Sequence, residues 1–453
     1  MNLYDLMQQR REAAGPIRVG VIGAGKFASM FLTQAAGQPE FHVVGVAELD
    51  PARAEASLER TGWAADRYGR ISLDEARESG RTAVVTDSLE LVSSEHVEVI
   101  LEVTGNPLVG TKHALAAIEH GKHIIMVNVE ADCMVGPILK EKADAAGVVY
   151  SMAYGDQPAL ISEMVDWCRT VGYEVVAAGK GTKYLPEYEE STPETVWGYY
   201  GLTEAQAQAG GMNPQMFNSF IDGTKSAIEM AAVANATGLV PDADGLLFPP
   251  VSVDDLSQQL IPAERGGVLR QTGTVEVVSS LERDGSEIER DLRWGVYVTF
   301  KARTEYAAAC FTEYGVITDA SGEYASLYRP YHMIGMELGV SIASAVLRGE
   351  ATGAPKAFIG DVISVAKRDL APGDVLDGEG GYTVRGALTS AERSLDGRCL
   401  PMGLAHGAKV IRAVAKGQPV SWDDVELPAD TIAVEVRREL EARAREARST
   451  AAA

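Results

Sequence analysis

The sequence is short of cysteine, of basic residues and of long apolar runs. Its four cysteines lie far apart, with no C-x-x-C pair and no His-Cys cluster at zinc spacing, which predicts reduced core thiols rather than a disulfide framework. Lys and Arg number 41 against 64 Asp and Glu, and the net charge of −23 disfavours nucleic acid and anionic membranes as partners. No apolar run reaches the ~18 residues of a membrane-spanning helix, and the first residues do not resemble a signal peptide. We therefore expect a cytoplasmic protein.

The chain is long enough for several buried cores. Its 453 residues, 46% of them hydrophobic, predict about two to four domains. Short apolar runs alternate with helical patterns over residues 17–155, which is the rhythm of βαβ units. The expected strands of this region are 17–22, 42–47, 97–103, 123–128 and 148–152. The pattern predicts the α/β class, with a Rossmann domain over 1–155 built on a doubly wound parallel sheet.

Three further segments follow this domain. Residues 156–350 predict an inserted α+β domain, in which 214–237 forms one long helix and 272–281 pairs with 290–302 as a hairpin across an Asp-Gly turn. A helix over 331–348 ends this domain and could pack back on the first. Residues 357–430 are rich in short strands and regularly placed turns, and 431–453 predict a charged helix that frays at its end.

The strongest local motif is a glycine-rich loop between the first expected strand and helix. In IRVGVIGAGKFA, the small residues Gly23, Gly25 and Ala28 occupy the positions of the pattern G-x-G-x-x-G/A. The first permits a tight turn, the second lets a pyrophosphate approach the backbone, and the third keeps the helix close to the strand. Amides at the helix N-terminus, where Lys26 and Phe27 lie, would then meet the negative charge. The alternative is a purely structural turn.

The kind of dinucleotide depends on residues after the second strand. Glu48 ends that strand 20 residues after Ala28, where a carboxylate would bind ribose hydroxyls and repel a 2′-phosphate. Arg53, one turn into the next helix, could instead pair with such a phosphate, or could be an ordinary solvated residue. Together, Glu48 and Arg53 slightly favour NAD, and we expect the cofactor to be NAD or NADP, abbreviated NAD(P).

Two other strand ends carry polar residues that could hold the nicotinamide and its ribose, because open parallel sheets bind ligands at the carboxyl ends of their strands. These residues are Thr104, Gly105 and Asn106 after one strand, and Asn128 and Glu130 after another. Both asparagines could equally cap the helices that follow them.

Clusters of charge in the second domain could move a hydroxyl proton or bind an anion. Lys180 and Lys183 flank a glycine after an expected strand, where desolvation and a neighbouring cation would lower a lysine pKa. Asp222, Lys225 and Glu229 lie at the start of the long helix, on a face that is otherwise apolar. The alternatives are solvated lysines, a helix cap and an i,i+4 pair.

A third cluster, in SLYRPYHMIGME, brackets a proline turn. Arg329 could grip an anionic group, and His332, the only histidine of the second domain, could exchange protons near pH 7, although a structural histidine is the alternative. The expected catalytic residues are Lys183, Asp222 and Lys225, and the expected substrate-binding residues are Lys180, Glu229, Arg329 and His332. No metal site is expected from the residues alone.

Several stretches resemble known oxidoreductases. GKHIIMVNVEADCMVG resembles the GKHVVTANKALLA stretch of homoserine dehydrogenases, and AAGKGTKYLPEY is similar to their NGTTNYIL segment. The lysine of the first stretch is replaced by Val129 in this chain. An aspartate and a lysine that lie four residues apart in that family correspond to Asp222 and Lys225, which lie three apart. The resemblance therefore implies a related enzyme rather than homoserine dehydrogenase itself.

The closing stretch, with AKRDLAPGDVL and KGQPVSWDDVELP, resembles a SAF domain, a small β-clip module. Over residues 15–430 the chain looks like the homoserine-dehydrogenase-like proteins with a C-terminal SAF domain. That group includes the 1-deoxy-D-xylulose 5-phosphate reductoisomerase-like enzymes (DRL), which use NADPH. The resemblance also implies a homodimer or homotetramer built on the sheet of the second domain.

These observations favour an NAD(P)-dependent oxidoreductase that exchanges hydride with a small polar hydroxy or keto substrate, expected to be anionic. In this hypothesis Lys183 or Lys225 moves the hydroxyl proton and Asp222 orients that lysine. One alternative is a reductoisomerase of isoprenoid synthesis, for which Asp222 and Glu229 could bind a divalent metal. Another is a non-catalytic sensor of a dinucleotide and a sugar-like ligand.

Overall fold

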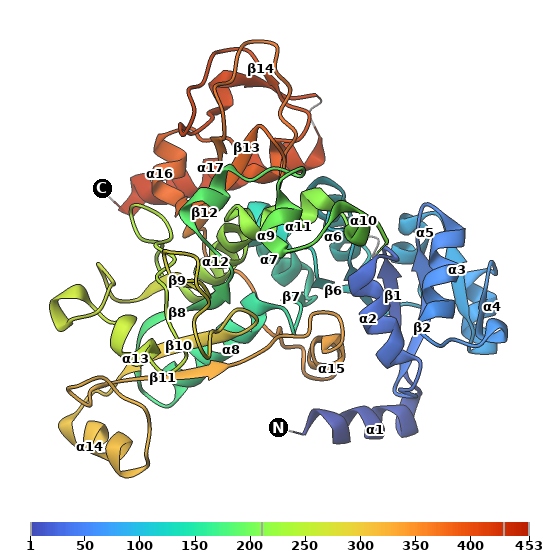
Figure 1. The fold of residues 1–453 in the computed structure, drawn as a ribbon. Coiled ribbons are helices and arrows are strands. Elements are labelled where there is room, and N and C mark those ends of the chain that lie inside the picture. The colour runs from blue at the N-terminus through green and yellow to red at the C-terminus, as the bar shows by residue number, and fades with distance from the viewer. Residues whose placement is uncertain (1, 210–211, 429–430, 452–453) are drawn as a thin grey trace. The chain divides into compact units, whose positions relative to one another are not determined.

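The computed structural model describes residues 2–209, 212–428 and 431–451, and the chain divides into two compact units (Figure 1). Unit 1 comprises Met1–Leu160 and Met333–Pro355, and unit 2 comprises Ile161–His332 and Lys356–Ala453. The chain thus leaves the first unit close to the expected boundary at residue 155. Residues 333–350, assigned by sequence to the end of the second domain with a helix that could pack back on the first, belong to unit 1.

Unit 1 is built on a seven-stranded sheet in the order β3-β4-β2-β1-β5-β6-β7, and every pair of neighbours is parallel. The strands are β1 (Ile17–Ile22), β2 (Phe41–Ala47), β3 (Tyr68–Gly69), β4 (Thr82–Val85), β5 (Val99–Glu102), β6 (His123–Met126) and β7 (Tyr150–Met152). Five of them coincide with the five apolar runs, because strands covered on both faces are apolar throughout. The α/β prediction is confirmed, with β3 and β4 added at one edge.

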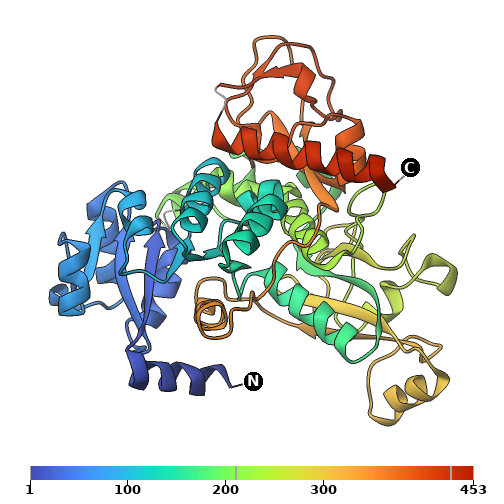
Figure 2. The same cartoon turned by 180° about the vertical axis from the view of Figure 1, so that it is seen from behind.

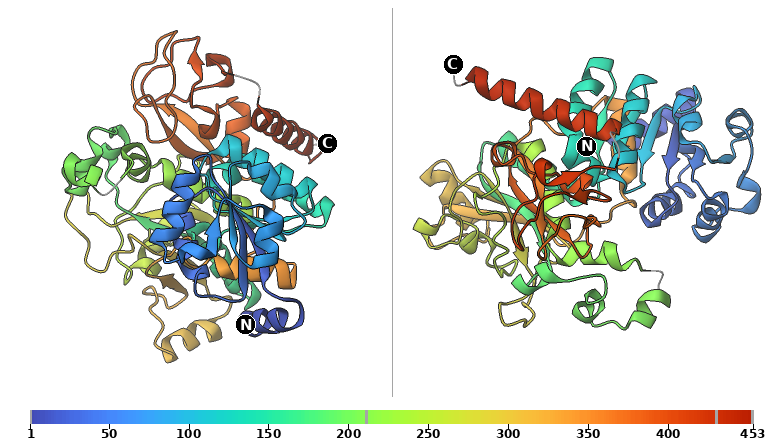
Figure 3. Two further views of the ribbon diagram at one scale, coloured as in Figure 1. Left: turned by 90° about the vertical axis from the view of Figure 1, so that its right-hand side faces the viewer. Right: turned by 90° about the horizontal axis from the view of Figure 1, so that it is seen from above.

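Helices cover both faces of this sheet, as the blue and cyan ribbons of Figure 3 show. They are α1 (Leu3–Ala14), α2 (Lys26–Ala35), α3 (Pro51–Arg60), α4 (Leu73–Ser79), α5 (Ser88–Ser93), α6 (Pro107–Glu119), α7 (Val129–Ala146) and α15 (Leu338–Arg348), with a 3₁₀ turn at Ala65–Arg67. Short polar side chains start several of them: Asp50, Asp87, Asn106 and Asn128 each accept amide N–H groups of the following first turn.

Helix α15 belongs to this unit although it lies far along the chain. Leu338 and Ile342 are buried in the same apolar cluster as the residues of β1 and α2. The sequence predicted a helix from Tyr331, whereas α15 begins only at Leu338. One reason is Gly335, whose φ of +85° is left-handed and whose Cα lies against the carbonyl of Phe27, so that an added Cβ would sit 2.6 Å from that oxygen.

Unit 2 contains a four-stranded sheet in the order β11-β10-β8-β9, from β8 (Glu174–Thr182), β9 (Thr274–Ser279), β10 (Val296–Lys301) and β11 (Tyr324–Arg329). β8 pairs in parallel with β9, and β10 is antiparallel to both its neighbours.

The predicted hairpin between 272–281 and 290–302 is therefore wrong, because β8 separates the two strands. The Asp-Gly turn closes only one bridge, between Leu281 and Glu287. Two glycines of β8 explain the preference: an added Cβ would lie 1.7 Å from the Glu276 oxygen at Gly179, and 1.9 Å from the Leu292 oxygen at Gly181. Only glycine lets both flanking segments approach β8 so closely.

The helices of unit 2 also differ from the sequence prediction. The long helix expected over 214–237 is two helices, α11 (Pro214–Ile221) and α12 (Thr224–Thr237), because Gly223 between them adopts a φ of +87°. The remaining helical segments before β11 are α8 (Gln157–Thr170), which begins in unit 1, the 3₁₀ turn Pro186–Glu190, α9 (Val196–Tyr200), α10 (Glu204–Ala209), α13 (Leu256–Gln259), the 3₁₀ turn Ala263–Arg265 and α14 (Glu305–Glu313).

The rest of unit 2 is a small β-rich domain. Its elements are β12 (Gly360–Ala366), β13 (Val384–Ser390), α16 (Ala391–Asp396), the 3₁₀ turns Met402–Leu404 and Trp422–Asp424, β14 (Lys409–Val410), β15 (Val425–Glu426) and α17 (Ile432–Ala451). Helix α17 lies along this domain (Figure 2) because Arg437, with a fully buried side chain, donates to Asp361 at 2.5 Å and to Glu441 at 3.0 Å. The helix continues through the residues expected to fray; Asp430 and the last two residues lie outside the described part.

Candidate functional site

The glycine-rich loop of unit 1 joins β1 to α2. Gly23 has a φ of +103°, and an added Cβ would lie 3.1 Å from the Val103 carbonyl oxygen, so this position needs glycine. The amide of Gly23 donates to the Ala47 carbonyl, and no described residue accepts from the amides of Gly25, Lys26 or Phe27. The start of α2 therefore presents unbonded N–H groups and the positive end of a helix dipole, which suits a diphosphate.

The two residues expected to choose the cofactor both lie at this loop. The Glu48 carboxylate accepts the amide of Ala24 at 3.0 Å and is mostly buried, so it also supports the loop itself. The Arg53 guanidinium lies 4.0 Å from Glu48 and is 60% exposed, beside the Cα of Gly25. Arg53 is thus largely solvated, as one of the two interpretations expected, and its guanidinium lies beside the loop.

The polar residues after β5 and β6 meet one another. Asn106 caps α6 and Asn128 caps α7, and the Asn128 amide also donates to the Asn106 carbonyl at 2.9 Å. The capping interpretation of both asparagines is correct in this structure. Thr104 and Gly105 are exposed, and Glu130 lies in the first turn of α7. This edge therefore joins two strand ends through side-chain contacts, as a cofactor-binding edge would require.

Behind this edge lies a chain of buried polar side chains. Glu102, at the end of β5, is fully buried, accepts the Thr104 hydroxyl at 2.6 Å and lies 3.1 Å from His113 Nδ1. The other ring nitrogen of His113 lies 2.9 Å from the Ser88 hydroxyl. The second carboxylate oxygen of Glu102 has no partner among the described residues. The network holds the exposed Thr104 in place from inside the domain.

A second buried acid lies in α7. Asp132 accepts the Tyr150 hydroxyl at 2.7 Å, and its other oxygen has no partner among the described residues. Burial raises the pKa of Asp132 to about 7, while the hydrogen bond from Tyr150 opposes that shift. Burial also raises the pKa of Tyr150, and the nearby acids Asp132 and Glu102 raise it further. Asp132 therefore exchanges its proton near neutral pH.

In unit 2, one row of residues crosses the sheet and gathers several expected site residues. Val296 of β10 pairs with Lys180 of β8 on one side and with Arg329 of β11 on the other. Directly paired residues share a face, so the two cations project to the same side. On that side the Lys180 ammonium is buried and bound to the Glu229 carboxylate of α12. The partner of Glu229 is thus Lys180, whereas the structural alternative considered from the sequence was an i,i+4 pair with Lys225.

A second group of cations lies beyond the end of β8. The Lys183 ammonium donates to the Tyr199 carbonyl at 2.6 Å. Burial lowers the pKa of Lys183, and the nearby positive charge of Arg293 lowers it further. The next residue, Trp294, lies 4.9 Å under the Arg293 guanidinium, and its carbonyl is 2.8 Å from His332 Nδ1. Lys183, Arg293 and His332 are therefore parts of one polar region.

The start of α12 differs from expectation. Asp222 is fully buried and bound at 2.6 Å by the ammonium of Lys367, a residue of the C-terminal domain that sequence analysis did not single out. Its other oxygen accepts the amide of Thr224, the first residue of the helix. Lys225, half-buried, lies one turn before Glu229. Asp222 is thus directed to Lys367 rather than to the lysine expected to move protons.

Asp222 and Glu229, which could have bound a divalent metal, do not form a metal site in this structure. Asp222 and Glu229, the two acids considered as oxygen ligands, are each bound by a lysine. In the described part of the chain, no three His, Cys, Asp or Glu side chains gather as a metal centre would need.

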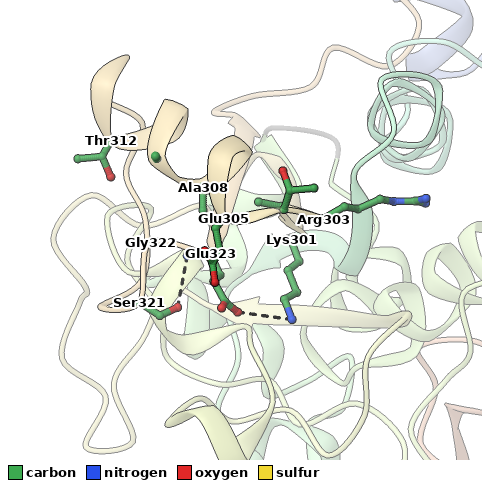
Figure 4. Close-up of a pocket in the computed structure, with 11 residues that line it drawn as sticks. Lys301, Arg303, Glu305, Ala308, Thr312, Ser321, Gly322 and Glu323 are labelled. Atoms are coloured by element: carbon green, nitrogen blue, oxygen red, sulfur yellow. Dashed lines mark hydrogen bonds and ion pairs between the residues drawn. The ribbon is translucent and has the colours of Figure 1, made fainter.

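The cavity drawn in Figure 4 lies away from these groups. Its volume is about 380 Å³, and it is lined by α14, by the end of β10 and by residues 321–323. In Figure 4 the Lys301 side chain points to Glu323, whose carboxylate lies 3.5 Å away. Lys301 is the last residue of β10, whereas the row of site residues crosses that strand at its first residue, Val296. The cavity contains none of the expected site residues.

Sequence reasoning missed four buried or half-buried charges near the expected site: Glu102, Asp132, Arg293 and Lys367. A signal existed for two of them. Glu102 is one of two acids inside the apolar run 97–103, and Lys367 directly follows the apolar stretch DVISVA. A charge at the end of an apolar strand needs a partner, and these two find theirs in other segments.

Three segments of the chain match models of known protein families. Residues 17–126 match the NAD-binding Rossmann fold of an oxidoreductase family, and residues 155–338 match the catalytic domain of the oxidoreductase DRL. Residues 363–426 match the SAF domain. The sequence thus combines matches to the two domains of a DRL-type oxidoreductase with a match to a C-terminal SAF domain, in agreement with the resemblance. The predicted cofactor class, NAD(P), is confirmed by the family of the first domain. We call residues 360–426 the SAF domain below.

Similar solved structures include a 3-ketoreductase from Actinomadura kijaniata in complex with NADP (18% identity, 37% of this chain, 49% of that chain, TM-score 0.25). Biliverdin reductase from Synechocystis is 19% identical, with 38% of this chain and 48% of that chain covered and a TM-score of 0.27. Myo-inositol dehydrogenase from Lactobacillus casei is 16% identical, with 40% of this chain and 50% of that chain covered and a TM-score of 0.28. The chain spans about half the length of these proteins, and at such TM-scores the likeness decides nothing about its substrate. No curated protein matches the sequence. In the described part of the chain, no helix has the length and apolar character to cross a membrane.

Proposed function

We propose that this protein exchanges hydride between a nicotinamide cofactor and a small polar hydroxy or keto substrate that carries an anionic group. The observation that carries the proposal is the set of unbonded amides at Gly25, Lys26 and Phe27. These amides would hold the diphosphate, and Thr104, Gly105 and the Asn106–Asn128 edge would hold the nicotinamide end. When bound, such a cofactor supplies hydride exchange with a C–H bond of the substrate.

The protein's own contribution would be proton transfer and charge. In the oxidation direction the substrate's C–H electrons leave as hydride while its hydroxyl proton passes to a neutral lysine, and the carbonyl forms; reduction reverses both transfers. Lys183 suits this role because burial and Arg293 lower its pKa, and Lys225 is the alternative. Arg293 would bind the anionic group of the substrate, with Lys180 and Arg329 on the adjacent row.

Cofactor binding is tested by a variant that should fold normally. Gly25 has a φ of −74°, and an added Cβ meets only the Arg53 guanidinium, at 3.7 Å. Gly25→Val should therefore fold but cover the unbonded amides, and its affinity for NADH and NADPH should fall by about 100-fold or more. Gly37→Val, at the other end of α2, has similar room and serves as the control. Failure of the wild type to bind either dinucleotide in calorimetry would overturn the proposal.

Arg53 tests the choice of cofactor. We expect both dinucleotides to bind, with the exposed guanidinium of Arg53 pairing with a 2′-phosphate. Arg53→Met should then weaken NADPH by about tenfold and leave NADH nearly unchanged. An equal loss for both would show that Arg53 acts only through Glu48 and the loop.

The substrate roles are tested with a panel of sugar phosphates, polyols and hydroxy acids, screened by thermal shift with each cofactor. On the best substrate, Lys183→Met should lower kcat by about 100-fold or more, since proton transfer is lost. Arg293→Met should raise the substrate KM by about tenfold with a smaller change in kcat. Binding of a ligand without any turnover would instead favour the non-catalytic sensor.

The match of residues 155–338 to the DRL catalytic domain favours a second candidate, reductoisomerisation of 1-deoxy-D-xylulose 5-phosphate with NADPH. Such a substrate carries the anionic phosphate that Lys183 and Arg293 would bind. Rescue of a bacterial strain that lacks its ordinary reductoisomerase would support this candidate. No rescue, with good expression of the folded protein, would exclude it and leave the broader proposal intact.

A further inference from the structure

Helix α12 is the element that connects the expected site to the SAF domain. Apart from half-buried Lys225, every residue from Thr224 to Thr237 is buried, as is typical of a helix covered on all sides. One side faces β8, where Glu229 binds Lys180. The other side faces β12 and β13: Gly360, at the start of β12, approaches so closely that an added Cβ would lie 3.3 Å from the Cα of Ala231.

The SAF domain also determines how α12 begins. Lys367, at the end of β12, places its ammonium 2.6 Å from Asp222, 2.8 Å from the Ser191 carbonyl and 3.0 Å from the Gly381 carbonyl. Its side chain is 3% exposed and that of Asp222 is not exposed at all. A lysine that is buried with a carboxylate and two carbonyls is held in one position, because each ammonium proton has an acceptor.

Hydrogen bonds connect this buried ion pair to the first turn of α12. The Asp222 oxygen that does not meet Lys367 accepts the Thr224 amide at 3.0 Å, and the Thr224 hydroxyl accepts the Gly386 amide of β13 at 2.8 Å. Two residues of the SAF domain therefore hold Asp222, two residues before α12 begins, and Thr224, its first residue. Lys225 follows at once, and Glu229 lies one turn further.

We propose that the SAF domain supports the active site from the far side of α12, and that Lys367 is a positioning residue that fixes Lys225 and Glu229 through Asp222. The inference rests on the proposed function for its kinetic part only. Loss of the Lys367 contact would let the first turn of α12 move, and displacement of catalytic groups by about 1 Å lowers turnover strongly.

The test compares three variants of the full chain. Lys367→Met removes the ammonium, Lys367→Arg keeps the charge, and Lys416→Met is the matched control. Lys416 also joins the SAF domain to the preceding segment, through Glu190 at 2.7 Å, but the pair is exposed and does not touch α12. Each variant is first confirmed to be folded at the assay temperature by near-ultraviolet circular dichroism.

We expect Lys367→Met to lower kcat by about 10- to 100-fold with cofactor KM within about twofold, Lys367→Arg to restore part of the loss, and Lys416→Met to match the wild type. Amides of Ser226–Glu229 should exchange hydrogen about tenfold faster in Lys367→Met, and those of β8 should not. A folded Lys367→Met protein with wild-type kcat and wild-type exchange would overturn the inference.

The two proposals fail in different ways. If the wild type shows no turnover of any substrate, the proposed function fails, and the exchange rates of α12 still decide whether Lys367 positions this helix. If Lys367→Met has faster exchange but an unchanged kcat, the positioning role fails while the proposed function is kept. If Lys367→Met does not fold, the double variant Asp222→Asn/Lys367→Met, which removes both buried charges, replaces it with the same expected outcomes.

Discussion

Several buried acids have different kinds of partner in the two units, although Glu40 of unit 1, 3.5 Å from Arg11, is paired with a cation as well. In unit 1, Glu102 meets a histidine and a hydroxyl and Asp132 meets a phenol, and each acid keeps one oxygen without a described partner. In unit 2, three buried acids meet cations: Asp222 binds Lys367, Glu229 binds Lys180 and Asp361 binds Arg437. Burial without a cation raises the pKa of Asp132 to about 7, whereas an acid paired with a cation joins two segments.

This difference matches what each unit has to do. Glu102 of unit 1 lies behind the edge where a cofactor would bind and supports the exposed Thr104. The paired acids of unit 2 join segments that are far apart in sequence, and Lys367 and Asp222 are separated by 144 intervening residues. Charge therefore supports a local edge in one unit and a long-range junction in the other.

The largest expected effect is on the junction of α17. Arg437→Met leaves Asp361 buried without its cation, which should lower the free energy of unfolding by about 3–5 kcal/mol in urea titration. Arg443→Met, which removes an exposed partner of Glu439 on the same helix, is the control and should cost less than about 0.5 kcal/mol. A loss below about 1 kcal/mol for Arg437→Met would remove the distinction between the units.

The next effect concerns pH and Asp132. The pKa of this acid is raised from 3.8 to about 7 in the folded state, so the folded protein holds the proton more tightly than the unfolded chain does. Its stabilising contribution is fully present below pH 4 and is lost as pH rises to 7. The loss amounts to roughly 4 kcal/mol. Asp132→Asn, which can still accept from Tyr150, should abolish this part of the pH dependence in urea titrations. If the free energy of unfolding of the variant depended on pH as steeply as that of the wild type, the raised pKa of Asp132 would be contradicted.

A smaller effect should appear at Glu276, the exception within unit 2. Burial raises the pKa of Glu276 to about 7 although its carboxylate accepts the amides of Leu247, Phe248 and Val277. Its stability contribution therefore also declines as pH rises from about 4.5 to 7. Glu276→Gln should flatten that decline but destabilise the protein by about 1–3 kcal/mol at pH 5, because the new NH₂ group meets backbone donors. A variant as stable as the wild type at pH 5 would contradict the amide contacts.

The smallest effect should be at exposed pairs, which ought not to distinguish the units. Lys140 and Asp144 of α7 form an exposed i,i+4 pair at 2.5 Å. Lys140→Met should change the free energy of unfolding by about 0.3–0.5 kcal/mol, the range expected for such pairs. A change above about 1 kcal/mol, measured beside Arg443→Met of unit 2, would show that exposure is the wrong criterion for ranking these charges.

The parts of the fold that follow from local patterns were predictable. The apolar runs identified five strands of unit 1, and the glycine motif identified the loop before α2, because each depends on neighbouring residues alone. The predicted hairpin failed because an Asp-Gly turn favours local pairing, whereas Gly179 and Gly181 allow β8 to take the central place. The single helix over 214–237 failed because Gly223 adopts a left-handed conformation that the helical pattern around it conceals.

The site was predictable by residue type but not by pairing. Lys180, Lys183, Glu229, Arg329 and His332 do lie at one end of one sheet or on the helix beside it. Their partners were not predictable, since the tie between Lys180 and Glu229 depends on how α12 packs. Sequence spacing suggested Lys225 for Glu229 and a catalytic lysine for Asp222, and packing supplied Lys180 and Lys367 instead.

By itself, the sequence determined that the chain has a Rossmann domain with a dinucleotide loop, a second domain with three clusters of charged candidate residues and a closing β-rich module. Those features depend on periodicity and on residues within a few positions of each other. Only the tertiary structure decided which buried charges are paired and that the SAF domain holds the start of α12. A buried charge takes its partner from whatever segment packs against it, and that segment is set by the three-dimensional arrangement and not by distance along the chain.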